Sequence, residues 1–216
     1  MTDFGEIGRL ILSAGGIVAL DARAVQASVA VTDQAGPADL VRPTPCGGWT
    51  LDQLLAHMAG QHDGFAAAAA GNGADPAVWR PRPPAADPVA EYAAAAGRVQ
   101  AAFAADGMLD RDFTLPEIDP AATFPAALAI SFHFIDYVVH GWDVARTLGL
   151  DYQLEPDLLG VALAVAAAVP DDDRTRRRPG AAFAPRVSAP AGAGPLDQVM
   201  ALLGRPPGWS AGPPAG

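Results

Sequence analysis

The sequence predicts a mainly α-helical protein, with a four-helix bundle over residues 1–150 and a C-terminal extension over residues 151–216. Apolar residues recur at the helical period in several long segments, whereas no segment of any length alternates like a strand. The 23 glycines and 21 prolines are too many for helix interiors, so we expect them in loops and in a Pro/Gly-rich arm near the C-terminus. A chain of 216 residues, half of them hydrophobic, can bury one core without disulfides.

The first helix is expected to start at Asp3, because Glu6 follows three residues later as in a capping box. Apolar residues continue at helical spacing as far as Val29. Gly15 and Gly16 fall in the middle of this segment, and each costs about 1 kcal/mol relative to alanine in a helix interior. We therefore expect a kink or a close backbone contact at this glycine pair.

The second helix should begin after Thr50, whose hydroxyl can cap the first turn while Gln53 returns the bond. Its apolar positions continue to about Gly71, and a Pro-rich loop follows over residues 72–88. A third helix over residues 88–105 is rich in alanine, the strongest helix former. The connector after it is expected to be extended only briefly, at residues 113–115.

The longest apolar block, over residues 125–148, predicts the fourth helix, and Gly149 is a typical helix stop. A shorter helix over residues 156–169 begins with a proline in its first turn. We interpret the Asp-Asp-Asp-Arg-Thr-Arg-Arg-Arg run at residues 171–178 as a solvated turn with ion pairs between its two halves. A last short helix is expected over residues 195–203.

Charge and residue usage exclude several functions. A net charge of −10 repels nucleic-acid phosphates and anionic lipid. All 14 basic residues are arginines, which excludes chemistry that needs a lysine, such as a Schiff base or a phosphate-binding loop. The single cysteine, Cys46, cannot form an internal disulfide, and we expect it to be a packed loop residue. With no basic-then-apolar leader and no apolar helix of about 20 residues, a cytoplasmic protein is expected.

The fourth predicted helix carries one polar stripe. His133, Asp136, His140 and Asp143 fall within about 80° of arc on one side of the helix. The rest of the helix is almost entirely apolar, which indicates burial, so the stripe must be paired internally or bind something. A solvated face would more typically use Lys, Glu, Arg and Gln. Histidine and aspartate are residues of metal coordination and proton transfer, and their pattern favours a metal site.

Imidazole nitrogen and carboxylate oxygen suit a borderline divalent cation, Zn²⁺ first, with Ni²⁺, Fe²⁺ or Mn²⁺ as alternatives. One helix cannot close a tetrahedral site, so a further ligand must come from elsewhere. The remaining histidines are His57 and His62, both on the second predicted helix. Periodicity slightly favours His62, which falls in the middle of the apolar stripe, whereas His57 lies at its edge.

Two motifs resemble one protein family. The first is Thr-Pro-Cys-Gly-Gly-Trp-Thr at residues 44–50 with Leu-Leu-Ala-His-Met at 54–58, and the second is Asp-Tyr-Val-Val-His-Gly-Trp-Asp-Val-Ala-Arg at 136–146. In this order they resemble the actinobacterial metal-binding proteins related to mycothiol-dependent maleylpyruvate isomerase, which belong to the DinB-like superfamily of four-helix bundles. The Leu-Leu-Gly-Arg ending at 202–205 is similar to the short tail of other members.

The resemblance implies metal ligands at His57, Asp136 and His140, and it selects His57 over His62. The family usually has Glu at the position of Asp136, so this shorter carboxylate must approach the cation more closely or bind it differently. The isomerases carry a second, mixed α/β domain after the bundle, whereas this chain has only its Pro-rich arm. Maleylpyruvate isomerisation itself is therefore not transferred to this chain.

Three protein ligands would leave one coordination position open, as in catalytic zinc sites. The resemblance implies mycothiol as the occupant, since a thiol bound to a cation becomes a nucleophilic thiolate. We therefore predict a thiol-dependent S-transferase or isomerase that acts on a small electrophile. One alternative is a hydrolase or lyase that uses metal-bound water. Another is a metal-stabilised bundle without catalysis that binds a small ligand or a regulatory partner. The predicted oligomeric state is a monomer or a homodimer.

Further residues are expected around the metal. Asp143 and His133 could orient ligands or relay protons, although Asp143 could instead simply pair with Arg146. The expected pocket-lining residues, which could alternatively be core residues, are Trp49, Trp142 and His62.

Overall fold

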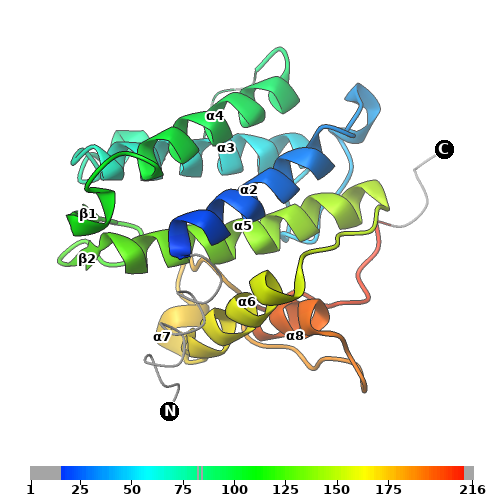
Figure 1. The fold of residues 1–216 in the computed structure, drawn as a ribbon. Coiled ribbons are helices and arrows are strands. Elements are labelled where there is room, and N and C mark those ends of the chain that lie inside the picture. Colours follow the sequence, from blue (N-terminus) through cyan, green and yellow to red (C-terminus); the bar gives the residue numbers. More distant parts are fainter. Residues whose placement is uncertain (1–15, 82, 84, 212–216) are drawn as a thin grey trace.

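The computed structural model describes residues 16–81, 83 and 85–211. Within these residues the long helices are α2 (Ile17–Thr32), α3 (Leu51–Ala69), α4 (Pro88–Phe103) and α5 (Ala126–Leu148). In Figure 1, α3 packs beside α4 and α2 packs beside α5, which completes a four-helix bundle. The C-terminal extension follows as α6 (Pro156–Ala168), α7 (Asp173–Arg176) and α8 (Pro195–Leu202), gathered on the side of α5 that faces away from α4. The predicted mainly α-helical class is confirmed.

The start of α2 differs from the prediction. Gly16 has φ of 91°, in the left-handed region that only glycine adopts at little cost, and the helix begins at the next residue. Gly16 is therefore a helix boundary and not a kink within a longer helix. The part of the predicted helix before Gly16, including Asp3 and Glu6, lies outside the described residues. At its other end α2 continues to Thr32, beyond the predicted Val29.

Local signals set the ends of the two helices that matter most for the site. Thr50 and Gln53 form the predicted capping box at the start of α3, with both reciprocal bonds present. Gly149 ends α5 in the left-handed conformation, with φ of 74°. Both boundaries confirm predictions, because capping depends on residues within one turn of the helix end.

A short hairpin precedes α5. Strand β1 (Asp112–Thr114) pairs antiparallel with β2 (Thr123–Pro125), and Phe113 stands opposite Phe124. The extended conformation near residue 113 was predicted, but its partner strand was not. A strand of three residues is too short to show alternation in the sequence. Only the pairing of β2 with β1 identifies β2 as a strand.

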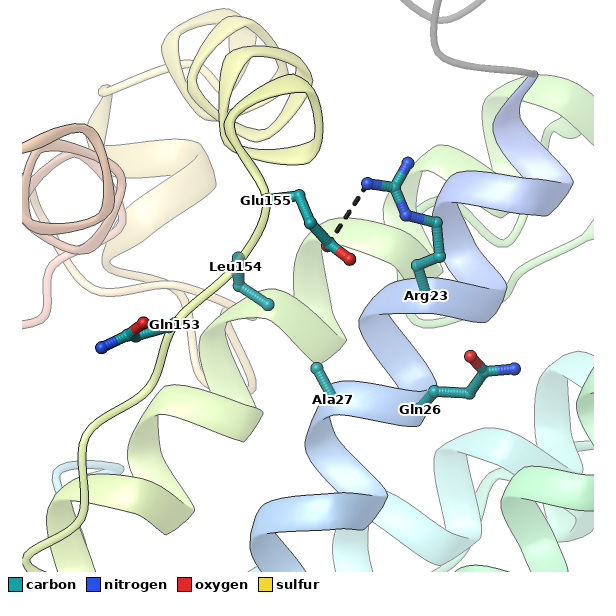
Figure 2. Close-up of a pocket in the computed structure, with 6 residues that line it drawn as sticks. All are labelled: Arg23, Gln26, Ala27, Gln153, Leu154 and Glu155. Carbon is teal, nitrogen blue, oxygen red and sulfur yellow. Dashed lines mark ion pairs between the residues drawn. The ribbon is translucent and has the colours of Figure 1, made fainter.

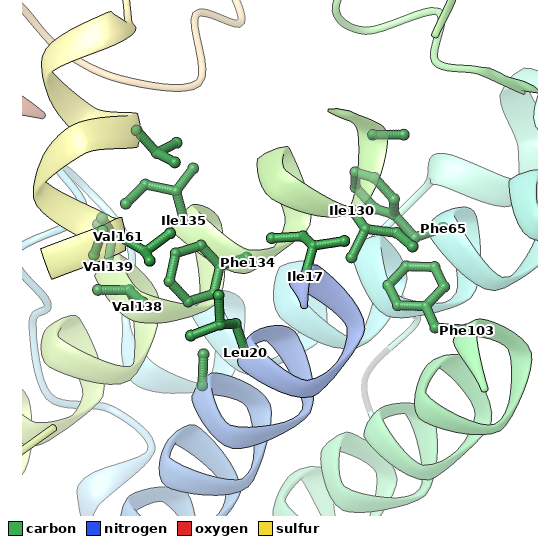
Figure 3. Close-up of a cluster of buried hydrophobic side chains, with 14 of the residues drawn as sticks. Ile17, Leu20, Phe65, Phe103, Ile130, Phe134, Ile135, Val138, Val139 and Val161 are labelled. Carbon is green, nitrogen blue, oxygen red and sulfur yellow. The ribbon is translucent and has the colours of Figure 1, made fainter. Parts of the chain in front are cut away.

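The buried core joins the bundle to the extension. Phe134 and Val138 of α5 pack with Leu20 of α2 and with Val161 of α6 in the larger hydrophobic cluster (Figure 3). A second cluster lies around Leu54 of α3 and contains residues of all four bundle helices. The extension is therefore held against α5 by the same apolar packing that holds α2 there.

The charged run at residues 171–178 is not simply a solvated turn. It contains α7, whose first turn is capped by the Asp172 carboxylate. Arg176 is 4% exposed, and its guanidinium donates to the carbonyls of Pro170, Ala184 and Leu202. The expected ion pairing within the run is present, since Arg177 lies 2.7 Å from Asp173. No described helix has the length and apolarity that a membrane span requires.

Candidate metal centre

Three ligand atoms converge between α3 and α5. They belong to His57, Asp136 and His140, and all lie within 4.8 Å of one another. Asp136 and His140 are four residues apart on α5 and so share one face, with Asp136 Oδ1 3.5 Å from His140 Nε2. The His57 ring on α3 lies 5.4 Å from the His140 ring at an angle of 80°. We call these residues the ligand set.

A hydrogen bond joins α3 and α5 next to the ligand set. The Tyr137 hydroxyl donates to the backbone carbonyl of Met58. Tyr137 follows Asp136 on α5, and Met58 follows His57 on α3, so the bond ties the two halves of the ligand set. Tyr137 is fully buried, and there its hydroxyl requires such an acceptor.

His140 is oriented by a buried carboxylate. Its Nδ1 lies 3.0 Å from Asp143 Oδ2, while Nε2 faces Asp136. Because an ionised carboxylate only accepts, the proton of a neutral His140 lies on Nδ1 and the lone pair on Nε2 is left for a cation. Asp143 is completely buried and accepts from Arg205 at 3.2 Å. Burial alone would raise the pKa of Asp143, but the Arg205 guanidinium and His140 outweigh it and hold the pKa below its usual value.

Asp143 thus pairs with Arg205. The alternative interpretation, in which Asp143 pairs with Arg146, is wrong. Arg146 instead lies over the Trp142 ring at 5.2 Å and donates to the carbonyl of Pro207. The partnership with Arg205 joins residues 62 positions apart, and nothing local in the sequence predicts it. The sole signal was the Leu-Leu-Gly-Arg tail motif that contains this arginine.

The donor chemistry of the ligand set fits a divalent cation. Burial, together with the neighbouring His140, lowers the pKa of His57 to about 4, so His57 is the neutral imidazole that metals require. Trp49 covers one side of it, with the ring centroids 4.7 Å apart. The Asp136 side chain is 19% exposed, so the set reaches solvent at this carboxylate. Two imidazoles and one carboxylate match a common zinc ligand set.

A second polar pair, which the sequence analysis did not identify, stands on the same face of α3. Gln61, one turn after His57, donates to Glu117 Oε2 at 3.0 Å. Burial raises the pKa of Glu117, which sits on the loop between the two strands. An isolated Glu in a loop carries no periodic signal, and only the fold places it beside α3.

The structure does not bring His62 and His133 to the ligand set. His133 Nδ1 lies 2.6 Å from Asp21 Oδ1, and its Nε2 lies 3.0 Å from His62 Nδ1. All three side chains are at most 1% exposed, and the His62 ring stacks on Tyr137 at 3.8 Å. Both nitrogens of His133 are therefore engaged away from the set. These contacts do not support a ligand-orienting role for His133 or a pocket-lining role for His62.

The two tryptophans and the cysteine are also placed. Trp49 contacts a member of the ligand set, whereas Trp142 is 1% exposed and belongs to the larger core cluster. Cys46 accepts a hydrogen bond from Arg205 Nη2 at 3.3 Å. Burial raises the pKa of Cys46 to about 12, so it is a neutral, packed thiol.

A surface groove of about 490 Å³ lies elsewhere, between α2 and the segment that leads into α6. Figure 2 shows Arg23 of α2 facing Glu155 across it. The Arg23 guanidinium also makes a bidentate contact with Asp157, at 2.7 and 2.8 Å. None of the residues that line this groove belongs to the ligand set. The Arg23 guanidinium in the groove is already paired with Glu155 and Asp157.

The fold and the site define a helical bundle with a candidate metal centre between α3 and α5. Residues 22–145 match the family described as the mycothiol maleylpyruvate isomerase N-terminal domain, and the chain belongs to this family. It is 33% identical over 166 residues to two uncharacterized proteins of Mycobacterium tuberculosis, MT0763 and Rv0738. The aligned part is 76% of this chain and 83% of each relative.

Two crystal structures of mycothiol-dependent maleylpyruvate isomerase, one of them a mutant, are similar to this structure. Their TM-scores are 0.53 for the mutant and 0.51 for the other structure, at 13% sequence identity. The matched part covers 74% of this chain and 69% of each solved chain. At this identity the likeness shows a shared fold.

Proposed function

We propose that this protein binds a divalent cation through His57, Asp136 and His140 and uses it to present a low-molecular-weight thiol to a small electrophile. The proposed reaction is an S-transfer or a thiol-assisted isomerisation, with mycothiol as the thiol and zinc as the first candidate metal. The main support is the convergence of two imidazoles and a carboxylate within 4.8 Å. Membership of a family named for a mycothiol-dependent enzyme suggests the thiol.

Each residue of the ligand set has a separate task in this proposal. His57 is partly buried beside His140, which disfavours its charged form, and it therefore offers a lone pair without first losing a proton. His140 is held in one tautomer by Asp143, so its Nε2 does not have to reorient when a cation arrives. Asp136 supplies the negative charge of the set. A cation held by three protein ligands keeps a position for a thiol and favours the thiolate form.

The surroundings support a substrate site beside the ligand set. Trp49 packs against His57 and supplies an apolar wall, while Asp136 is partly open to solvent. A small molecule can therefore approach from the Asp136 side without unfolding a helix. Asp143 acts as a positioning residue in this proposal, because it touches His140 and not the substrate.

Metal analysis tests the first half of the proposal. Elemental analysis of the purified protein should find one divalent metal per chain, and His57→Ala and His140→Ala should each lower its occupancy at least about tenfold. Asp136→Glu, which introduces the carboxylate usual in the family, should retain the metal. His62→Gln changes a histidine of the same helix outside the set and should also retain it. Unchanged occupancy in both alanine variants would disprove the site.

Thiol dependence tests the second half. Cobalt-substituted protein should change its visible spectrum when mycothiol is added, and the loaded protein should conjugate mycothiol to members of a panel of small electrophiles. If no thiol perturbs the cobalt spectrum and no conjugate forms, the thiol-dependent proposal is wrong. Hydrolysis that needs no thiol would instead indicate activation of metal-bound water. Metal binding without any turnover would indicate a binding protein.

A further inference from the structure

A second group of metal-ligating atoms lies next to the ligand set. Atoms of Cys46, His140 and Asp143 also lie within 4.8 Å of one another. His140 belongs to both groups, because its Nδ1 faces Asp143 at 3.0 Å and its Nε2 faces Asp136 at 3.5 Å. Zinc accepts cysteine sulfur, histidine nitrogen and aspartate oxygen alike. Within the described residues, two neighbouring groups of side chains therefore offer ligand atoms that suit the same class of cation.

A guanidinium fills the second group. Arg205 Nη2 lies 3.3 Å from Cys46 Sγ and 3.2 Å from Asp143 Oδ2, and Arg205 Nε also bonds both Asp143 oxygens. Arg205 is 5% exposed and Asp143 is not exposed at all, so the charge of one is neutralised by the other inside the protein. Arg205 thus contacts two of the atoms that a metal would bind and supplies the positive charge that a metal would bring.

We propose that Arg205 is a resident cation that occupies the Cys46–His140–Asp143 group and keeps divalent metal out of it. Because Asp143 bonds both Arg205 and His140 Nδ1, His140 Nε2 is the nitrogen left for a metal, which is thereby directed to the ligand set. This inference rests on the proposed metal site. It adds a reason why a metal would bind the ligand set and not the Cys46–His140–Asp143 group.

The proposal gives the C-terminal extension a part in the metal centre. Arg205 follows α8. Two residues later the chain is held against α5, where Arg146 donates to the carbonyl of Pro207 at 3.2 Å. Removal of the Arg205 side chain would leave Asp143 buried without its counter-charge and Cys46 without its donor. A divalent cation can then replace the lost charge, with Cys46 binding as a thiolate and its proton released to solvent.

Cobalt spectroscopy of matched variants tests this inference. Arg205→Ala should show a sulfur-to-cobalt charge-transfer band when titrated with Co²⁺, and the double variant Cys46→Ser with Arg205→Ala should lack it. Wild-type protein should show no such band, and neither should Arg205→Lys, which keeps a cation at the position. If Arg205→Ala does not fold by circular dichroism, Arg205→Gln, which keeps an amide donor without the charge, takes its place.

Two results would overturn the inference. One is a sulfur-to-cobalt band in the wild-type protein, which would mean that Arg205 does not exclude the metal. The other is a folded Arg205→Ala or Arg205→Gln variant that binds cobalt without the band. These outcomes are separable from the proposed function: absence of metal from wild type with a band in Arg205→Ala would reject the first site and keep the second.

Discussion

Asp21 is predicted to be a major determinant of stability. Its carboxylate lies 2.6 Å from His133 Nδ1, and both side chains are at most 1% exposed. Asp21→Ala removes the acceptor and leaves the buried His133 nitrogen without a partner. Leaving this buried nitrogen without an acceptor costs about 1–3 kcal/mol. Asp21→Asn keeps an oxygen acceptor of the same shape, so His133 Nδ1 keeps a partner and the loss should be smaller, about 1 kcal/mol or less.

Thermal unfolding followed by circular dichroism at a helical wavelength measures both changes. For a chain of this length, the transition temperature should fall by about 2–4 °C per kcal/mol, so we expect a decrease of about 2–12 °C for Asp21→Ala and a smaller one for Asp21→Asn. Asp33→Asn is the matched control, because Asp33 is exposed at the end of α2, and its substitution should stay within about 0.5 kcal/mol of wild type.

The comparison among the three variants decides whether the reasoning is right. If Asp21→Ala costs no more than Asp33→Asn, the buried pair contributes nothing and the argument from burial is wrong. If Asp21→Asn costs as much as Asp21→Ala, the amide does not replace the carboxylate as an acceptor, and the charge of Asp21 rather than its hydrogen bond determines the effect.

Other features give further predictions. Burial, with His133 beside it, holds the pKa of His62 well below its ordinary 6.5, so the folded state binds fewer protons than the unfolded state and stability falls as the pH drops below 6.5. His62→Gln should remove about 1.4 kcal/mol of the stability that the protein loses between pH 7.5 and 5.5, measured on metal-free protein by urea unfolding. In Gly64→Ala the added Cβ would overlap the Trp79 indole, and thermal unfolding should show a loss of about 1–3 kcal/mol, whereas the control Gly97→Ala on α4, where a Cβ meets nothing within 4 Å, should be neutral or stabilising. Tyr137→Phe deletes the bond that ties α5 to α3 and should cost about 0.5–1.5 kcal/mol in urea unfolding; unchanged stability would mean that this bond does not hold the helices.

Much of the site could be predicted because it depends on helical periodicity. The spacing of Asp136 and His140 places both side chains on one face of α5 wherever that helix packs. Thr50 and Gln53 likewise determine the start of α3 within a single turn. Periodicity slightly favoured His62, whereas the structure places His57 beside Asp136 and His140, because periodicity shows which residues face inward and not what they meet there. The family resemblance selected His57.

The sequence by itself determined the helices, their caps and the polar stripe on α5, because these features depend on residues within a few positions of one another. Only the tertiary structure decided the partners. Asp143 meets Arg205 across 62 positions, His133 meets Asp21 across 112, and β2 exists because β1 lies beside it. Such contacts form when buried apolar packing brings distant segments together, and a buried charge or polar atom then bonds to whichever group the packing has placed beside it.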